Sequence, residues 1–268
     1  MNNLTINYNN IDYCIDVSSP LEISIPYNFN GNQPNFYNVP PGTKEPLKFG
    51  ESIFDNKNGC NVPIFKFNIH CTGTHTETIG HILDEKNFYI NKILPLNFLS
   101  SVLITINPVC HSKTIESYHV ETTNDDLVIT SSQVKDAISK FDINLIEALI
   151  IRTTPNDSSK MYRKYVGNMH PFFTNEAMRF ISSLNISHII IDTPSVDRAD
   201  DGGVLLNHKI FWCIDKDNNS PKSLRTITEF AFIDNSIQDD HYFIQFLLPN
   251  FNNHVSPSRP ILYRCNNV

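Results

Sequence analysis

Apolar and polar residues alternate with a period of two in several short runs of the chain, which predicts β-strands. Residues 4–8 and 11–17 alternate in this way and are separated by Asn9-Asn10, a pair that favours a hairpin turn. Residues 64–69 also alternate, and predict a strand that leads into a histidine-rich segment. Almost wholly apolar runs rich in β-branched residues predict further, buried strands at 102–106, 148–151, 188–192 and 243–248.

Two segments carry the apolar spacing and the start signals of helices. A serine of the pair at 131–132 is expected to cap a helix that runs to about Lys140. Thr174 is expected to cap a second helix over residues 175–184, where Glu176 in the first turn suits the helix dipole. Helices alternate with strands only in this second half of the chain.

The remaining pattern bears on domain organisation. Residues 26–62 are rich in Asn, Pro and Gly, which predicts one long loop. No internal repeat or low-complexity linker divides the chain. Strands outnumber helices, and we therefore expect a single mixed α/β domain over residues 1–268.

Composition and charge restrict the classes of protein. The chain has 268 residues, of which 40% are hydrophobic and 18% charged, enough to bury a core. Its net charge of −7, with scattered basic residues, argues against a nucleic-acid partner. The start has no basic and apolar leader, and polar residues interrupt the most apolar stretch, 88–106, so no membrane partner is expected. Six cysteines without a CxxC pair are typical of reduced thiols, which favours a cytoplasmic location.

Metal-ligand residue types are concentrated in residues 70–81, which read HCTGTHTETIGH. Zinc and similar ions bind imidazole, thiolate and carboxylate groups. His75 and Glu77 are two residues apart, so on an extended segment both side chains point to the same side. Gly73 permits a conformation or a close approach that a Cβ atom would block. The segment therefore indicates a metal site whose remaining ligands lie elsewhere in the chain.

The segment resembles the N-terminal signature of the cyclase family of metal-dependent hydrolases, which includes kynurenine formamidases and isatin hydrolases. The family pattern is similar to HxGTHxDxPxH. Here Gly73-Thr74-His75 matches, Glu77 stands at the aspartate, and His81 stands at the last histidine. Other stretches are similar in the same order: Met169-His170-Pro171, the DTPSxD stretch at 192–197, His208, Glu229, Leu248-Pro249 and the SPxR stretch at 256–259.

The resemblance implies a swivelling β/β/α fold, typically dimeric, with two divalent metal ions, zinc first and manganese as an alternative. The implied ligands are His70, His75 and Glu77 for one ion, and Glu77, His208 and Glu229 for the other. His81 would be the acid/base that passes a proton to the leaving amine. Two ions about 3.5–4 Å apart would activate water, lowering its pKa from 15.7 to roughly 7.

The first ligand is where this chain departs from the family pattern. The family's first histidine lies four residues before the Gly-Thr-His histidine, and Cys71 occupies that position here. Either a one-residue bulge brings His70 to the metal, or the Cys71 thiolate is the ligand. We favour His70, because imidazole preserves the ligand chemistry. A polar insertion at 215–222, between His208 and Glu229, is expected to be a surface loop.

Several other candidate residues have simpler interpretations. Ser195 lacks a GxSxG elbow, which argues against a serine hydrolase. The pair at 200–201 is expected to be a solvated turn, and Trp212 a core residue. Residues 35–37 could line the substrate pocket or simply pack within the loop. Surface positions or satisfied core positions are expected for the remaining histidines: His111, His119, His188, His241 and His254.

These observations favour a metal-dependent amidohydrolase that acts on a small cyclic or N-acyl amide. N-formylkynurenine, an intermediate of tryptophan catabolism, is the substrate that the resemblance suggests. A non-catalytic protein of the same fold that binds a metal or a small ligand is the alternative from another class. Hydrolysis of a lactone or an ester would use the same site.

Overall fold

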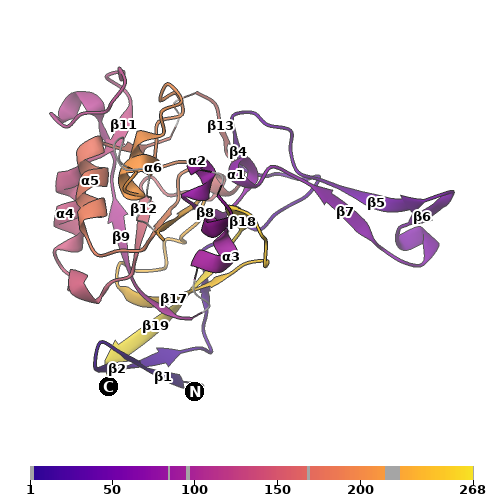
Figure 1. Ribbon diagram of the computed structural model, residues 1–268, viewed down its shortest axis with the longest axis horizontal. Coiled ribbons are helices and arrows are strands. Elements are labelled where there is room, and N and C mark those ends of the chain that lie inside the picture. Colours follow the sequence, from indigo (N-terminus) through magenta and orange to yellow (C-terminus); the bar gives the residue numbers. More distant parts are fainter. Residues whose placement is uncertain (1–2, 84, 95–96, 168–169, 215–223, 268) are drawn as a thin grey trace.

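The computed structural model describes residues 3–83, 85–94, 97–167, 170–214 and 224–267, and an 11-stranded mixed sheet runs through it (Figure 1). Four parallel strands form its centre: β9 (Leu99–Ile106), β12 (Ala148–Thr153), β15 (His188–Ile191) and β16 (Thr226–Glu229). Antiparallel strands extend it beyond β9: β17 (His241–Leu247), β19 (Arg259–Asn267), β2 (Ile11–Asp16) and β1 (Asn3–Tyr8), with β3 (Leu21–Glu22) also on β19. Beyond β16 lie β8 (His75–Thr78) and β18 (Val255–Pro257), both antiparallel to their neighbours. The expected mixed α/β fold is confirmed.

The central strands are apolar throughout because both faces of the sheet are covered. Ile151 belongs to a core cluster with Val134 of α4 (Ser131–Ile138) and Ile181 of α5 (Asn175–Ser183). Its neighbour Ile150 points to the opposite face and packs in a cluster with Ile244 of β17. This arrangement explains why the strands predicted at 102–106, 148–151 and 188–192 lack polar alternation.

The two predicted helices are present, and one starts differently from the prediction. Thr174 caps α5 by accepting a hydrogen bond from the Ala177 backbone, as predicted. The predicted serine cap of α4 is wrong, because Thr130 and Gln133 form a reciprocal capping box one residue earlier. The Ser131 hydroxyl instead donates to Glu116. Helix α4 ends at Ile138, two residues before the predicted end.

The predicted hairpin of β1 and β2 is confirmed. Tyr8 pairs with Ile11 across the turn. Asn9 and Asn10 both have positive φ angles, 50° and 64°, as a two-residue hairpin turn requires. The predicted strand at 243–248 is β17, which begins two residues earlier.

The long loop predicted at 26–62 is wrong. Strands β5 (Thr43–Phe49), β6 (Ser52–Phe54) and β7 (Pro63–Lys66) form a three-stranded antiparallel arm that projects from the body of the molecule (Figure 1). Gly50, with φ of 58°, makes the turn between β5 and β6. Because most side chains of this arm are exposed, its sequence lacks the apolar alternation that identifies a half-buried strand. The strand predicted at 64–69 ends early, at Lys66.

The remaining elements are short. The strands are β4 (Asn35–Phe36), β10 (Val109–Cys110), β11 (Leu127–Ile129), β13 (Lys164–Tyr165) and β14 (Phe172–Phe173). The α-helices are α1 (Ile69–Thr72), α2 (Gly80–Leu83), α3 (Ile90–Ile93) and α6 (Leu206–Phe211). Single 3-10 turns lie at Asn56–Asn58, Lys86–Phe88, His111–Lys113, Ile143–Leu145 and Ser158–Met161. Among the described residues, no helix has the length and apolarity needed to cross a bilayer. Met169 and the predicted insertion at 215–222 lie outside the described residues.

Candidate metal centre

Strand β8 places the two central side chains of the site. It runs between β16 and β18, and its register sets His75 opposite Glu229. Glu77 follows two residues later, so both side chains point to the same side of the strand, as predicted. The Thr76 and Thr228 hydroxyls, 2.7 Å apart, meet from the neighbouring strands and help to fix this register.

Gly73 allows the chain to enter β8 in close contact with Tyr27. A Cβ atom at position 73 would lie 2.7 Å from Cζ of the Tyr27 ring, closer than real side chains approach. The predicted close approach is therefore present, and the contacting group is the Tyr27 ring. The half-buried Tyr27 ring packs in turn against Phe29 and Phe67 at the base of the arm.

The first ligand group consists of His70, His75 and Glu77, whose ligand atoms all lie within 4.8 Å of one another. Nδ1 of His70 lies 3.0 Å from Glu77 Oε2. Nδ1 of His75 lies 3.0 Å from the Gly73 carbonyl oxygen and donates to it, so Nε2 is left to face the site. That Nε2 atom is fully buried and has no hydrogen-bond partner.

The chain brings His70 into this group by a helical turn, and the predicted bulge is wrong. Asn68 caps α1 by accepting a hydrogen bond from the Cys71 backbone N–H, which turns His70 toward Glu77. Cys71 points into an apolar cluster with Phe36 and Phe230, and burial raises the pKa of its thiol to about 11. A thiol that holds its proton so firmly is a poor metal ligand.

The second ligand group consists of Glu77, His208 and Glu229, all buried and again within 4.8 Å of one another. Nε2 of His208 lies 3.0 Å from Glu77 Oε1 and 3.5 Å from Glu229 Oε1. Glu229 also lies 3.4 Å from Nε2 of His75, and the Val196 backbone N–H donates to it. Glu77 thus belongs to both groups.

Asp197 holds His208 in place, a role that the sequence analysis did not assign. It accepts a hydrogen bond of 2.7 Å from Nδ1 of His208 and one of 2.8 Å from the Tyr118 hydroxyl. The backbone N–H groups of Asn207 and His208 donate to the same carboxylate. The sequence contains one signal for this role of Asp197, which is its position at the end of the DTPSxD stretch. A carboxylate behind a histidine ligand fixes the ring and the tautomer.

The charges of the site are arranged for a cation. Burial opposes ionisation of Glu77, but His81, His208 and His70 outweigh it and hold its pKa well below 4.5. Burial also opposes protonation of His208, but its contacts with Asp197, Glu229 and Glu77 raise its pKa well above 6.5. Without a metal ion, the buried carboxylates are therefore compensated by protons on histidine.

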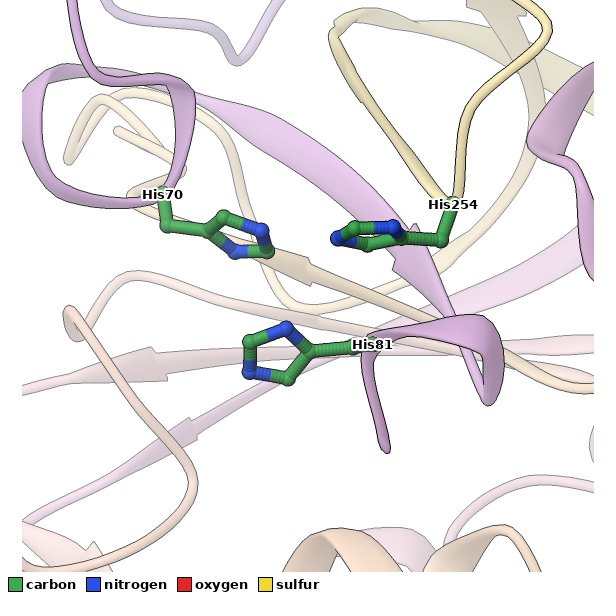
Figure 2. Close-up of side chains that lie close together, drawn as sticks. All are labelled: His70, His81 and His254. Atoms are coloured by element: carbon green, nitrogen blue, oxygen red, sulfur yellow. The ribbon is translucent and has the colours of Figure 1, made fainter. Parts of the chain in front are cut away.

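His81 lies beside the first group on helix α2. Its ring centre is 4.4 Å from that of His70 and 6.0 Å from that of His208. Burial lowers its pKa to about 4, so its imidazole is neutral at pH 7. His254 lies next to both His70 and His81 (Figure 2). The expectation that His254 is an unrelated surface or core histidine is wrong, because pairing of β18 with β8 brings it to the site.

The side chains present fit divalent metal ions. They combine imidazole and carboxylate groups, the donor set that zinc and manganese take. The clearest sign is Nε2 of buried His75, which makes no hydrogen bond and has only the longer 3.4 Å contact with Glu229, since a buried polar atom ordinarily has a hydrogen-bond partner. A cation would satisfy this atom and neutralise Glu77 and Glu229 together.

Other residues that the sequence singled out have structural roles. The Ser195 hydroxyl accepts from the Asp197 backbone N–H, as part of a turn. Asp201 is buried and accepts from the backbones of Gly203 and Leu205, so the predicted solvated turn is wrong at this residue. Trp212 is fully buried, as expected. The four remaining histidines each contact a neighbouring group: Thr122 for His111, Asp201 for His119, Thr226 for His188 and Ser100 for His241.

A pocket of about 280 Å³ has a lining that includes Phe36, Tyr37 and Tyr165. Phe36 and Tyr165 also belong to the apolar cluster that holds Phe230, the residue after Glu229. Phe36 and Tyr37 thus line a pocket, whereas Asn35 is buried and is not among its lining residues; a role in binding substrate stays a prediction. A hollow of about 480 Å³ elsewhere lies between β9 and α4, away from the ligand groups.

Comparison with protein families gives one match: the model of the Cyclase family, described as "Putative cyclase", covers residues 15–198. The chain belongs to this family. The match includes the segment at 70–81 and the DTPSxD stretch, and it ends before His208 and Glu229, which join the site through the fold. No curated protein matches the chain.

Solved structures related to this cyclase-family chain share its fold. One is a predicted metal-dependent hydrolase from Bacillus stearothermophilus, with 18% identity, a TM-score of 0.58, and coverage of 91% of this chain and 98% of that one. Isatin hydrolase A from Labrenzia aggregata has 12% identity and a TM-score of 0.60, with coverage of 91% and 93%. Isatin hydrolase A from Ralstonia solanacearum has 12% identity and a TM-score of 0.54, with coverage of 91% of both chains.

Proposed function

We propose that this cyclase-family chain is a metal-dependent hydrolase of a small amide, with two divalent cations bound at the site. The observation that carries the proposal is the pair of ligand groups that share Glu77. His70 and His75 would complete the first site, and His208 and Glu229 the second. The structural relatives, which include a predicted metal-dependent hydrolase and two isatin hydrolases, support it.

The chemistry follows from the side chains around these sites. Divalent cations held there would supply Lewis-acid activation of water and stabilise negative charge on the carbonyl oxygen of the substrate. His81, neutral at pH 7, would accept a proton from the attacking water and donate it to the leaving nitrogen. Glu77 and Glu229 have no proton to give, because their pKa values are lowered.

An aryl amide is the substrate class that we favour, with N-formylkynurenine or a related cyclic amide as the first candidates. The pocket of about 280 Å³ supports this choice, because the aromatic side chains of Phe36, Tyr37 and Tyr165 line it. Rings of this kind pack well against a planar aromatic substrate. Zinc and manganese both suit the proposed ligands.

The deciding experiment compares wild-type protein with His81→Ala after reconstitution with zinc or manganese. Both are assayed with N-formylkynurenine, isatin, N-acyl anilines, lactones and aryl esters, and their metal content is measured. We expect the wild type to hydrolyse an amide of this panel, and His81→Ala to lose at least a hundredfold in kcat while its metal-to-chain ratio is unchanged. Metal-loaded wild type that turns over no member of the panel would favour a non-catalytic binding protein. Turnover of lactones or esters alone would reassign the substrate class.

We also propose that the chain acts as a homodimer. The projecting arm supports this, because it exposes the large apolar side chains of Phe49, Ile64 and Phe65, of which 78%, 52% and 47% are accessible. Large apolar side chains left exposed on a projecting element often mark contacts between proteins. Analytical ultracentrifugation of the wild type should give a dimer, and Phe49→Ser combined with Phe65→Ser should shift it toward monomer.

All six cysteines are free, which supports a reducing, cytoplasmic location.

A further inference from the structure

Three histidines from separate parts of the chain meet at the edge of the proposed metal centre (Figure 2). His70 comes from α1, His81 from α2, and His254 from the segment just before β18. Their ring centres are 4.4 Å apart for His70 and His81, 5.6 Å for His70 and His254, and 5.8 Å for His81 and His254. One ring nitrogen of each residue lies within 4.8 Å of the other two.

The backbone around His254 holds it firmly against α2. Its carbonyl oxygen accepts a hydrogen bond of 3.0 Å from the Thr78 backbone N–H. The Asn253 side chain accepts from the His254 backbone N–H at 2.8 Å. A Cβ atom at Gly80 would lie 2.8 Å from Cβ of His254, so only glycine at position 80 allows this approach. The position of His254 is thus built into the fold.

The ligand chemistry of the trio differs from that of the neighbouring groups. It offers three imidazoles and no carboxylate, a donor set that suits zinc, cobalt, nickel and copper and is unsuited to magnesium or calcium. Three histidines with an open fourth position form a known type of zinc site. With zinc–nitrogen distances of about 2.0–2.1 Å, ligand nitrogens lie roughly 3.3 Å apart, so small ring rotations would close the trio.

The trio can bind an ion while the first ligand group is also occupied. Nδ1 of His70 faces Glu77 at 3.0 Å. The nitrogen of His70 farther from its backbone points toward His254 in Figure 2. All three side chains are partly exposed, whereas His75, Glu77, His208 and Glu229 are buried. An ion at the trio would therefore exchange with solvent more readily than ions in the buried groups, and it would bind more weakly.

We propose that His70, His81 and His254 form a third metal site, which takes a zinc-like cation when the metal is in excess and thereby inhibits the enzyme. Inhibition follows because a neutral imidazole has only one nitrogen with a free lone pair, and a metal ion on His81 would use it, so the ring could no longer accept a proton. The inhibition rests on the proposed hydrolase function, whereas the existence of the third metal site does not. The site would lower activity when zinc is abundant and leave the first two ions in place.

The test is a metal titration of chelator-treated full-length protein with Co²⁺ and Zn²⁺, followed by equilibrium dialysis and elemental analysis. We expect wild type to bind two ions tightly and a third at least tenfold more weakly, with a new cobalt absorption band for the third. His254→Gln should bind only two, and His254→Cys, which restores a ligand, should bind three. His111→Gln, a substitution far from the trio, should behave as wild type. A third ion that persists in His254→Gln would overturn the proposal.

Activity measured on the same samples separates the two proposals. Two rates of hydrolysis are compared for each protein, one in excess Zn²⁺ and one at two equivalents of Zn²⁺. We expect the rate in excess Zn²⁺ to be at least tenfold lower for the wild type and the two rates to be nearly equal for His254→Gln. Equal inhibition of both proteins would remove the inhibitory role. Absence of any hydrolysis would count against the proposed function, and the stoichiometry would still decide whether the third site exists. A thermal unfolding scan in chelator shows whether His254→Gln is folded.

Discussion

Asp197 accepts a 2.7 Å hydrogen bond from Nδ1 of His208, and this bond directs the other ring nitrogen at Glu77, 3.0 Å away. The orientation of a ligand histidine is thus set by a residue that would not touch the metal. The same carboxylate is held by the Tyr118 hydroxyl and by backbone N–H groups of α6. The orientation of His208 is therefore set before any ion binds.

Replacing Asp197 with asparagine should weaken metal binding about 10–100-fold, because the amide cannot hold His208 as the carboxylate does. The affinity is measured by competition with a chromophoric chelator. Asp192→Asn is the matched control, since Asp192 is equally buried but pairs with Lys160. The control should lower the melting temperature and leave the metal affinity unchanged. An unaltered affinity in Asp197→Asn would contradict the orienting role.

The shared carboxylate predicts an unequal loss of metal among ligand variants. After reconstitution and dialysis, His75→Ala and Glu229→Gln should each lose one of two ions, because each removes a ligand of one group. Glu77→Gln should lose both. Metal-to-chain ratios by elemental analysis give the answer. A Glu77→Gln protein that retains two ions would rule out the shared arrangement.

The first ligand can be tested by paired substitutions at neighbouring positions. His70→Ala should reduce the affinity of the first ion at least tenfold, because it removes the imidazole 3.0 Å from Glu77. Cys71→Ser should bind metal like the wild type, because the thiol lies in an apolar cluster and its pKa is raised to about 11. Its melting temperature should fall by a few degrees through lost apolar packing. The reverse pattern of metal loss would assign the ligand role to Cys71.

The pKa shifts predict how pH affects the metal-free protein. His208 and His75 have raised pKa values, so their stabilisation is complete below pH 6.5 and is lost as the pH rises through the raised values. Glu77 and Glu229 have lowered pKa values, so their stabilisation is complete above pH 4.5 and is lost as the pH falls. His81, His170 and His188 act in the opposite direction to His208, because burial lowers their pKa values to about 4 and their stabilisation is lost as the pH falls below 6.5. Metal-free protein should therefore be most stable near pH 6.5 and should lose stability as the pH rises above it.

Cations bound at the proposed sites would take the place of protons on His208 and His75, so the metal-loaded protein should not lose stability as the pH rises. The melting temperatures of zinc-loaded and chelator-treated protein, measured from pH 5 to 9, should therefore diverge above pH 6.5. Each kcal/mol of difference corresponds to about 2–4 °C in a protein near this size. Parallel curves would show that the buried charges are compensated in some other way.

The sequence predicts the site best where its geometry is local. His75 and Glu77 follow from a period of two on a strand, and the resemblance places His208 and Glu229 with them. The sequence does not predict how His70 reaches the site, because the one-turn helix capped by Asn68 is too short to leave an apolar pattern. His254 is missed for another reason. Its position depends on the pairing of β18 with β8 and on contact with Gly80, which no local pattern records.

The same distinction holds for the fold. The central strands and α5 are predicted closely, because burial of both faces of the sheet and a threonine cap leave clear marks in the sequence. The arm of β5, β6 and β7 is not predicted because it buries little surface. Apolar and polar residues alternate along a strand only where one of its faces is buried. Its paired strands are held mainly by backbone hydrogen bonds, which every residue type except proline can donate.

The position of β8 between two later strands has a consequence for how the protein matures. His70, His75 and His81 are synthesised early, but β16 and β18, which flank β8, follow only at residues 226–229 and 255–257. While the chain is still growing on the ribosome, the early histidines and Glu77 are made before His208 and Glu229 exist. The complete ligand cluster therefore arises only after residue 257 has been made, so a cation that needs both ligand groups would be taken up after that point.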